Sequence, residues 1–161
     1  NSIINYNKFY CEFMDNFFAW SESNRQHLSV GAVILNSEGK ILTHKLVRIG
    51  NKYFLPKKTH KNGVALEQTL HTVEAETGYK VYIEKYLGSR QSTFPDNNGN
   101  SVNKTTLYFL CSVVEQTQRD SQDRDADSEL IWMNKSELIT LMQEQGKTEN
   151  DLDESEIFEK L

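Results

Sequence analysis

The sequence predicts an α/β protein in which helices pack on both faces of a mixed β-sheet, an α/β/α layering that three segments indicate. Ser29–Leu35 is an almost continuous apolar run rich in β-branched residues, as is typical of a buried strand. A second strongly apolar strand is expected at Thr105–Val114. Between them, Val64–Thr77 has apolar residues at helical spacing, and Gly78 follows as a helix stop.

The segment before the first strand predicts an extra N-terminal helix. Residues 1–20 are rich in aromatic side chains, and Phe9, Phe13 and Phe17 recur at i, i+4 and i+8. We expect this helix to belong to an extension over residues 1–28. Its apolar face packs either on the domain's own core or against a partner or a further segment of chain.

The remaining elements follow in order along the chain. Four more strands and one more helix are predicted, and the strands fall at residues 40–47, 52–55, 80–89 and 130–133. The helix begins near Asn134 or Ser136 and runs to about Gln143. Polar loops are expected at 57–63, 92–102 and 115–128. The domain therefore spans residues 29–144, and residues 145–161 form an acidic tail with a short helix possible near Glu154–Leu161.

Length, charge and cysteine content narrow the protein class. The chain has 161 residues, enough for one domain, and a formal charge of −5, which argues against general nucleic-acid binding. Two cysteines cannot form a disulfide scaffold, and no apolar run is long enough to cross a membrane. We expect an intracellular protein, cytoplasmic or nuclear. Because the chain does not begin with Met, we also expect an excised domain or a processed product.

Residues 56–80 resemble the signature of the Nudix hydrolase family. That signature follows a strand often ending in Leu-Pro, as Phe54–Pro56 does here, and it closes on Glu-x-Gly-aliphatic, as Glu76–Tyr79 nearly does. The surrounding strands and the last helix also resemble the family over roughly residues 29–144. The resemblance implies a Nudix-like α/β/α sandwich and, in active members, Mg²⁺-dependent hydrolysis of a diphosphate linkage.

The signature is degenerate at the positions that carry the chemistry. The family presents several carboxylates on one helix face to hold divalent cations. Here that face has Thr72, Ala75 and Glu76, which is one carboxylate where three are expected. His71 stands at the family's Arg position, and Lys57 stands at its opening Gly. Glu76 is therefore the sole candidate for both the catalytic residue and the metal ligand, and we expect ordinary Nudix catalysis to be lost.

A small shift of register leaves an active site open as an alternative. Glu67 would then take the place of the family's early Glu. Glu129 or an acidic residue from Asp120–Asp127 would supply a distal ligand or base.

A basic stretch follows the first predicted strand. No Asp or Glu occurs between Gly39 and Leu66, whereas residues 111–161 contain 14 acidic and 5 basic side chains. In a Nudix-like fold part of this stretch borders the substrate cleft, so we predict an anion site that has kept its attraction for phosphate. The candidate ligand-binding residues are Arg48, Lys57, Lys58, His60 and Lys61. The alternative to an anion site is a basic face that is simply exposed to solvent. His44 and His60 lie in the same stretch, but they are not spaced as metal ligands.

The phosphate ligand would be a nucleotide, an inositol polyphosphate or an RNA 5′ end. Leu55-Pro56-Lys57 is similar to a motif of family members that act on diadenosine or diphosphoinositol polyphosphates. Tyr53, Tyr79, Tyr82 and Tyr86 are candidates for stacking on a base, although packing within the fold is the favoured role of Tyr82 and Tyr86.

The sequence thus favours a non-catalytic Nudix-fold domain that binds a protein partner or a phosphorylated ligand, with no cofactor and no membrane contact. A divergent hydrolase that uses Mg²⁺ is the first alternative. A Nudix-like module that binds RNA is the second.

Overall fold

The computed structural model describes residues 19–21, 24–123 and 125–161. Its eight described strands form one sheet with the order β4-β3-β2-β7-β6, to which β1, β5 and β8 add through single partners. The strands are β1 Ala19–Ser21, β2 Asn24–Leu35, β3 Ile41–Leu46, β4 Lys52–Phe54, β5 Lys57–Thr59, β6 Tyr79–Pro95, β7 Ser101–Gln116 and β8 Glu129–Met133. The helices are α2 Leu66–His71, α3 Val73–Thr77 and α4 Lys135–Gly146, with 3-10 helices η1 Val47–Ile49, η2 Asn150–Leu152 and η3 Ser155–Lys160.

The sheet is mixed, as the sequence predicts. β2 runs parallel to β7, whereas β6 and β7 form a long antiparallel hairpin. β3 pairs antiparallel with both β4 and β8. A parallel pair needs a long crossover connection, and the chain between β2 and β7 contains α2 and α3.

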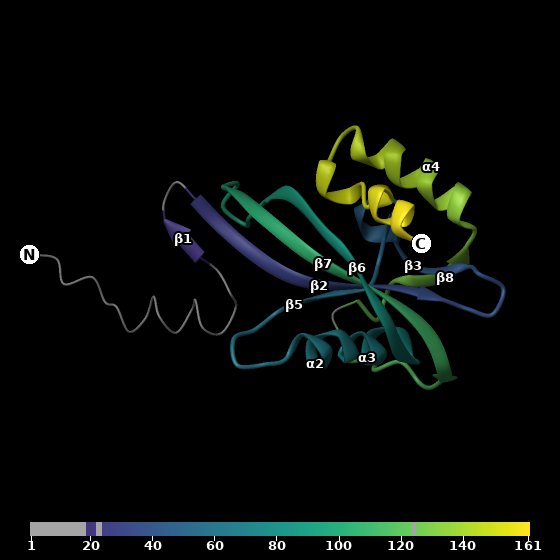
Figure 1. The fold of residues 1–161 in the computed structure, drawn as a ribbon. Coiled ribbons are helices and arrows are strands. Elements are labelled where there is room, and N and C mark those ends of the chain that lie inside the picture. The colour runs from purple at the N-terminus through teal and green to yellow at the C-terminus, as the bar shows by residue number, and fades with distance from the viewer. Residues whose placement is uncertain (1–18, 22–23, 124) are drawn as a thin grey trace, which may run out of the picture.

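Helices cover both faces of this sheet, which confirms the predicted layers. The pair α2 and α3 lies on one face, and α4 with the C-terminal 3-10 helices lies on the other (Figure 1). Successive side chains of a strand point to opposite faces. Val30, Ala32 and Ile34 of β2 therefore join the cluster of Leu70 under α2, while Val33 belongs to the cluster under α4.

Two local differences from the sequence prediction matter for the site. Lys57–Thr59 was expected to be a loop but forms strand β5, which pairs antiparallel with β2. The helix expected over residues 64–77 is interrupted at Thr72, whose hydroxyl donates to the carbonyl of Thr69 at 2.6 Å. Gly78 ends α3 as predicted, with a left-handed φ of 71°.

The predicted N-terminal helix lies mostly outside the described residues. At its expected end the structure has Ala19–Ser21 as strand β1, paired with β2. None of the helices within the described ranges is both long and apolar enough to span a bilayer.

The acidic C-terminal segment is not a separate tail, which corrects the expected division of the chain at residue 145. Ile157 and Phe158 of η3 are buried in the cluster under α4. The carboxylate of Glu154 accepts hydrogen bonds from the hydroxyl of Tyr108 at 2.6 Å and from the amide of Leu55 at 2.9 Å. Apolar side chains spaced among the acids therefore fix this segment to the sheet.

His27 of β2 predicts a pH dependence of stability. Burial, assisted by the charge of Lys104 and opposed by that of Asp151, lowers the pKa of His27 from 6.5 to about 4. Between these values the unfolded chain takes up a proton that the folded chain does not. The free energy of unfolding should therefore fall by roughly 2–3 kcal/mol in total as pH decreases through this window.

Urea unfolding of the wild type and His27→Gln at neutral pH and at about pH 5 measures this effect. The variant should lose less stability than the wild type between the two conditions. An equal loss in both proteins would show that His27 is not the source.

Candidate functional site

Glu76 lies at the centre of a buried polar network below the sheet. Helix α3 places its side chain toward β3 and β5, where it is only 1% exposed. Burying a carboxylate is strongly unfavourable unless it is paired and hydrogen-bonded. Its partners therefore decide what the site can do.

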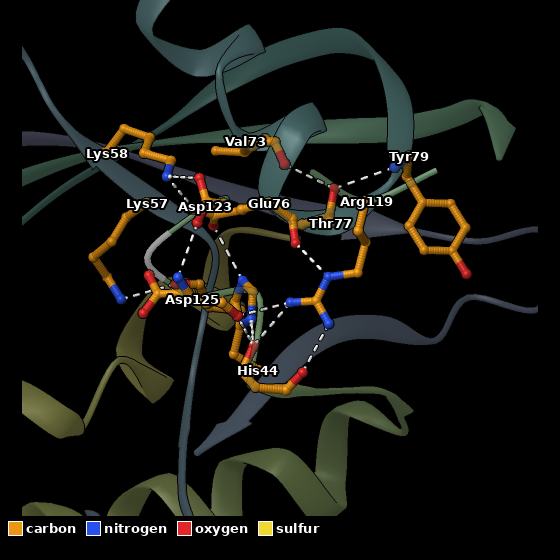
Figure 2. A network of polar contacts seen from close by, with 12 residues as sticks. His44, Lys57, Lys58, Val73, Glu76, Thr77, Tyr79, Arg119, Asp123 and Asp125 are labelled. Carbon is orange, nitrogen blue, oxygen red and sulfur yellow. Dashed lines mark hydrogen bonds and ion pairs between the residues drawn. The ribbon is translucent and has the colours of Figure 1, made fainter. Parts of the chain in front are cut away.

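Lys58 is the closest partner of Glu76. Its Nζ lies 2.6 Å from Glu76 Oε2 and 3.0 Å from Asp123 Oδ2, so that one ammonium group bridges two carboxylates (Figure 2). Strand β5 explains this placement, because alternation along a strand sends adjacent side chains to opposite faces. Lys57 accordingly pairs with Glu154 on the far side of the sheet, at 3.0 Å.

Asp123 belongs to a turn-rich acidic loop that Arg119 holds against α3. The guanidinium of Arg119 donates to the carbonyl of Glu76 at 2.7 Å and to the carbonyls of Asp125 and Ser128, both at 2.8 Å (Figure 2). The amide of Asp125 donates to Asp123 Oδ1 at 2.9 Å. These bonds fix the loop so that Asp123 faces Lys58.

His44 of β3 is the second partner of Glu76. Its Nε2 lies 3.1 Å from Glu76 Oε1, its Nδ1 lies 2.5 Å from Ser128 Oγ, and its ring stacks on Phe54 at 5.0 Å. Serine, histidine and acid thus connect in the order of a nucleophilic triad. However, Ser128 is buried and its hydroxyl donates to the carbonyl of Asp125 at 2.7 Å, so the arrangement is structural.

The charges of the network support one another. Burial alone would lower the pKa of Lys58, but the hydrogen bond and charge of Glu76, followed by those of Asp123, raise it. Burial likewise tends to raise the pKa of Asp123, yet the amide of Asp125 and then Lys58 bring it below its ordinary value. Lysine and carboxylate both remain charged at neutral pH.

The fold resemblance implies a divalent cation, and the network around Glu76 contains oxygen atoms of the kind that could bind one. Among the described residues, Glu76, Asp123 and Asp125 offer carboxylate oxygens that all lie within 4.8 Å of one another. Such oxygens are the ligands that Mg²⁺ prefers. But the Lys58 ammonium already lies between two of the three, and Thr72 and Ala75 supply no further carboxylate. The residues as arranged do not fit a metal ion.

Most of the predicted phosphate ligands are engaged in internal contacts. Lys57 and Lys58 each pair with a buried glutamate, on opposite sides of the sheet. Arg48 pairs with Asp127 at 2.5 Å and Asp125 at 3.6 Å. For the remaining two, His60 Nδ1 lies 2.7 Å from the hydroxyl of Thr69, and Lys61 is exposed. The structure does not bring these five residues together into one anion site.

The acidic residues named from sequence as alternative metal ligands lie partly in the network and partly away from it. Glu67 is exposed and lies 3.9 Å from His71, and Glu129 is exposed beside Lys45. The acidic range Asp120–Asp127 does supply the network, through Asp123. His71 pairs with Glu74 at 3.3 Å rather than with Glu76.

The tyrosines also differ from expectation. Tyr82 and Tyr86 were expected to pack within the fold, but on the edge strand β6 they are 61% and 53% exposed, and Tyr86 keeps one ring contact, with Phe109 at 5.3 Å. Tyr79 instead packs edge-on against Trp132 at 5.3 Å, and Tyr53 borders the core under α4.

Sequence reasoning missed His44 and Arg119 as members of the network. His44 lies at an inward position of an apolar strand, where a polar residue signals a buried partner. Arg119 is one of two basic residues in the acidic loop over residues 115–128, and this gave only a weak signal. Neither residue belongs to a sequence motif with a recognisable spacing.

Solved structures with the same architecture identify the fold. A MutT protein from Methanosarcina mazei Go1 matches with a TM-score of 0.57 and 19% identity, over 75% of this chain and 85% of that one. A Nudix hydrolase from Nitrosomonas europaea matches with a TM-score of 0.58 and 17% identity, over 84% and 87%. A UDP-X diphosphatase matches with a TM-score of 0.51 and 19% identity, over 81% of this chain and 60% of that one. No protein-family model and no curated protein sequence matches the chain.

Proposed function

We propose that this Nudix-fold domain does not hydrolyse diphosphates with a metal ion and that it serves as a binding domain within a larger protein or complex. The observation that supports this most directly is the Lys58 ammonium between Glu76 and Asp123. Metal-assisted phosphoryl chemistry needs carboxylates that are available to a cation, with open positions for water and substrate. Here the one carboxylate retained from the signature is buried and doubly engaged.

The five residues predicted from sequence give little support for a phosphate ligand. A free phosphate would have to compete with carboxylates that lie 2.5–3.0 Å from Arg48, Lys57 and Lys58. Lys61 is exposed, but a single exposed lysine provides little affinity by itself.

The second candidate is a divergent Mg²⁺-dependent hydrolase. The three oxygens from Glu76, Asp123 and Asp125 favour it, because their types suit a hard cation. It requires Lys58 to leave the network when metal and substrate bind.

One assay separates the two candidates. The purified chain is incubated with Mg²⁺ or Mn²⁺ and a panel of nucleoside diphosphate derivatives, dinucleoside polyphosphates and diphosphoinositol polyphosphates. We expect no turnover above buffer, and the same background for Glu76→Gln and for the control Glu137→Gln, which alters an exposed carboxylate of α4. Turnover in the wild type that persists in the control and disappears in Glu76→Gln would overturn the proposal.

A further inference from the structure

The buried polar network around Glu76 has a cation of its own. The Lys58 Nζ is within hydrogen-bond distance of Glu76 and Asp123 at once, and an ammonium group has three N–H donors. Its stem is largely covered, with 23% of the side chain exposed. The lysine side chain therefore lies mostly within the fold where it meets the two carboxylates.

A divalent ion and this ammonium group exclude one another. Mg²⁺ binds carboxylate oxygens at about 2.0–2.1 Å and keeps several waters in near-octahedral geometry. Glu76 Oε2 and Asp123 Oδ2 both face Lys58, so an ion that used these oxygens would occupy the position of the ammonium. Two cations so close together without further anions would repel each other strongly.

We infer that Lys58 is a built-in replacement for the divalent cation: its ammonium joins Glu76 of α3 to Asp123 of the acidic loop and closes the site without metal. The inference rests on the proposed non-catalytic function and adds the residue responsible. A latent metal site follows from it. Removing the lysine should leave Glu76, Asp123 and Asp125 as a group of carboxylates without the ammonium that bridges two of them, while Arg48 still lies 3.6 Å from Asp125.

Lys58→Met tests this directly, because methionine keeps an unbranched stem and removes the charge. Binding of Mn²⁺ is measured from the electron paramagnetic resonance signal of the free ion. We expect the variant to bind Mn²⁺ at least about tenfold more tightly than the wild type, since a multi-carboxylate site is a good ligand set for this hard cation. Mn²⁺ should also raise the thermal unfolding midpoint of the variant but not of the wild type.

The chain offers a matched control one residue away. Lys57→Met removes the same charge from the same strand, but the carboxylate that loses its ion pair is Glu154, which belongs to no cluster of three potential ligands within the described residues. This variant should gain no Mn²⁺ binding. The gain in Lys58→Met should disappear in the double variant Lys58→Met/Glu76→Gln. A folded Lys58→Met that binds Mn²⁺ no better than the wild type, or an equal gain in Lys57→Met, would overturn the inference.

A measurement on the wild type keeps the inference falsifiable if Lys58→Met fails to fold. Amide resonances of Lys58, Glu76 and Asp123 should be broadened by Mn²⁺ no more than that of Glu137. Selective broadening of the first three would contradict the built-in cation. Hydrolysis without such broadening would instead overturn the proposed function and leave the role of Lys58 intact, so the two failures are distinguishable.

Discussion

Replacing Glu76 by alanine is expected to lower the free energy of unfolding by about 3–5 kcal/mol. The substitution leaves His44, which is fully buried, and Lys58 without their shared carboxylate. A buried charge or polar group that loses its partner has a large desolvation penalty in the folded state. Urea unfolding monitored by circular dichroism measures the loss.

A carboxylate that binds a metal ion would be expected to have the opposite effect on the free energy of unfolding when it is removed. Carboxylates held together for catalysis repel one another without their cation, so that removing one often stabilises the protein. Glu67→Ala is the control on the neighbouring helix, because Glu67 is 75% exposed and its loss should change stability by less than about 0.5 kcal/mol. Stabilisation by Glu76→Ala would contradict the structural role of Glu76.

The second large effect concerns the C-terminal segment. Phe158→Ala should lower the free energy of unfolding by about 3–5 kcal/mol, because the ring is fully buried and its removal leaves a cavity under α4. The same urea titration measures it. Leu161→Ala, three residues further on and partly exposed, should have a much smaller effect.

A loss below about 1 kcal/mol for Phe158→Ala would mean that the segment does not contribute to the core. It would then behave as the separate acidic tail that composition suggests. The two outcomes differ by more than the error of denaturant extrapolation.

The fold was largely predictable because its core strands and helices carry periodic apolar patterns. β2 and β7 have such patterns on both faces, and α2 and α3 have one apolar stripe that ends at Gly78. Strand β5 was not predictable in this way. Its residues are polar, and backbone pairing with β2 holds it in place without apolar side chains of its own.

The missed strand also explains why Lys57 and Lys58 do not lie together. Adjacent lysines in a loop can converge on one ligand, whereas adjacent lysines in a strand point to opposite faces. Lys57 and Lys58 thus have separate glutamate partners, Glu154 and Glu76, which lie 97 and 18 residues away in sequence. Pairings set by tertiary packing leave no local signal.

The candidate site was predictable only in its position. Glu76 followed from the Nudix resemblance, and Asp123 lay within the acidic range named from sequence. The position of Lys58 between these two carboxylates depends on the register of β5 against β2. It depends also on the hydrogen bonds by which Arg119 fixes the acidic loop. Neither could be derived from residue spacing.

We infer that an ammonium group, and not a metal ion, holds this site together. Crystals of the wild-type chain soaked in millimolar MnCl₂ and measured at the manganese absorption edge test it most directly. We predict no anomalous peak beside Glu76, with Lys58 Nζ within hydrogen-bond distance of Glu76 and Asp123. An anomalous peak between these carboxylates, with the Lys58 side chain turned away, would contradict it.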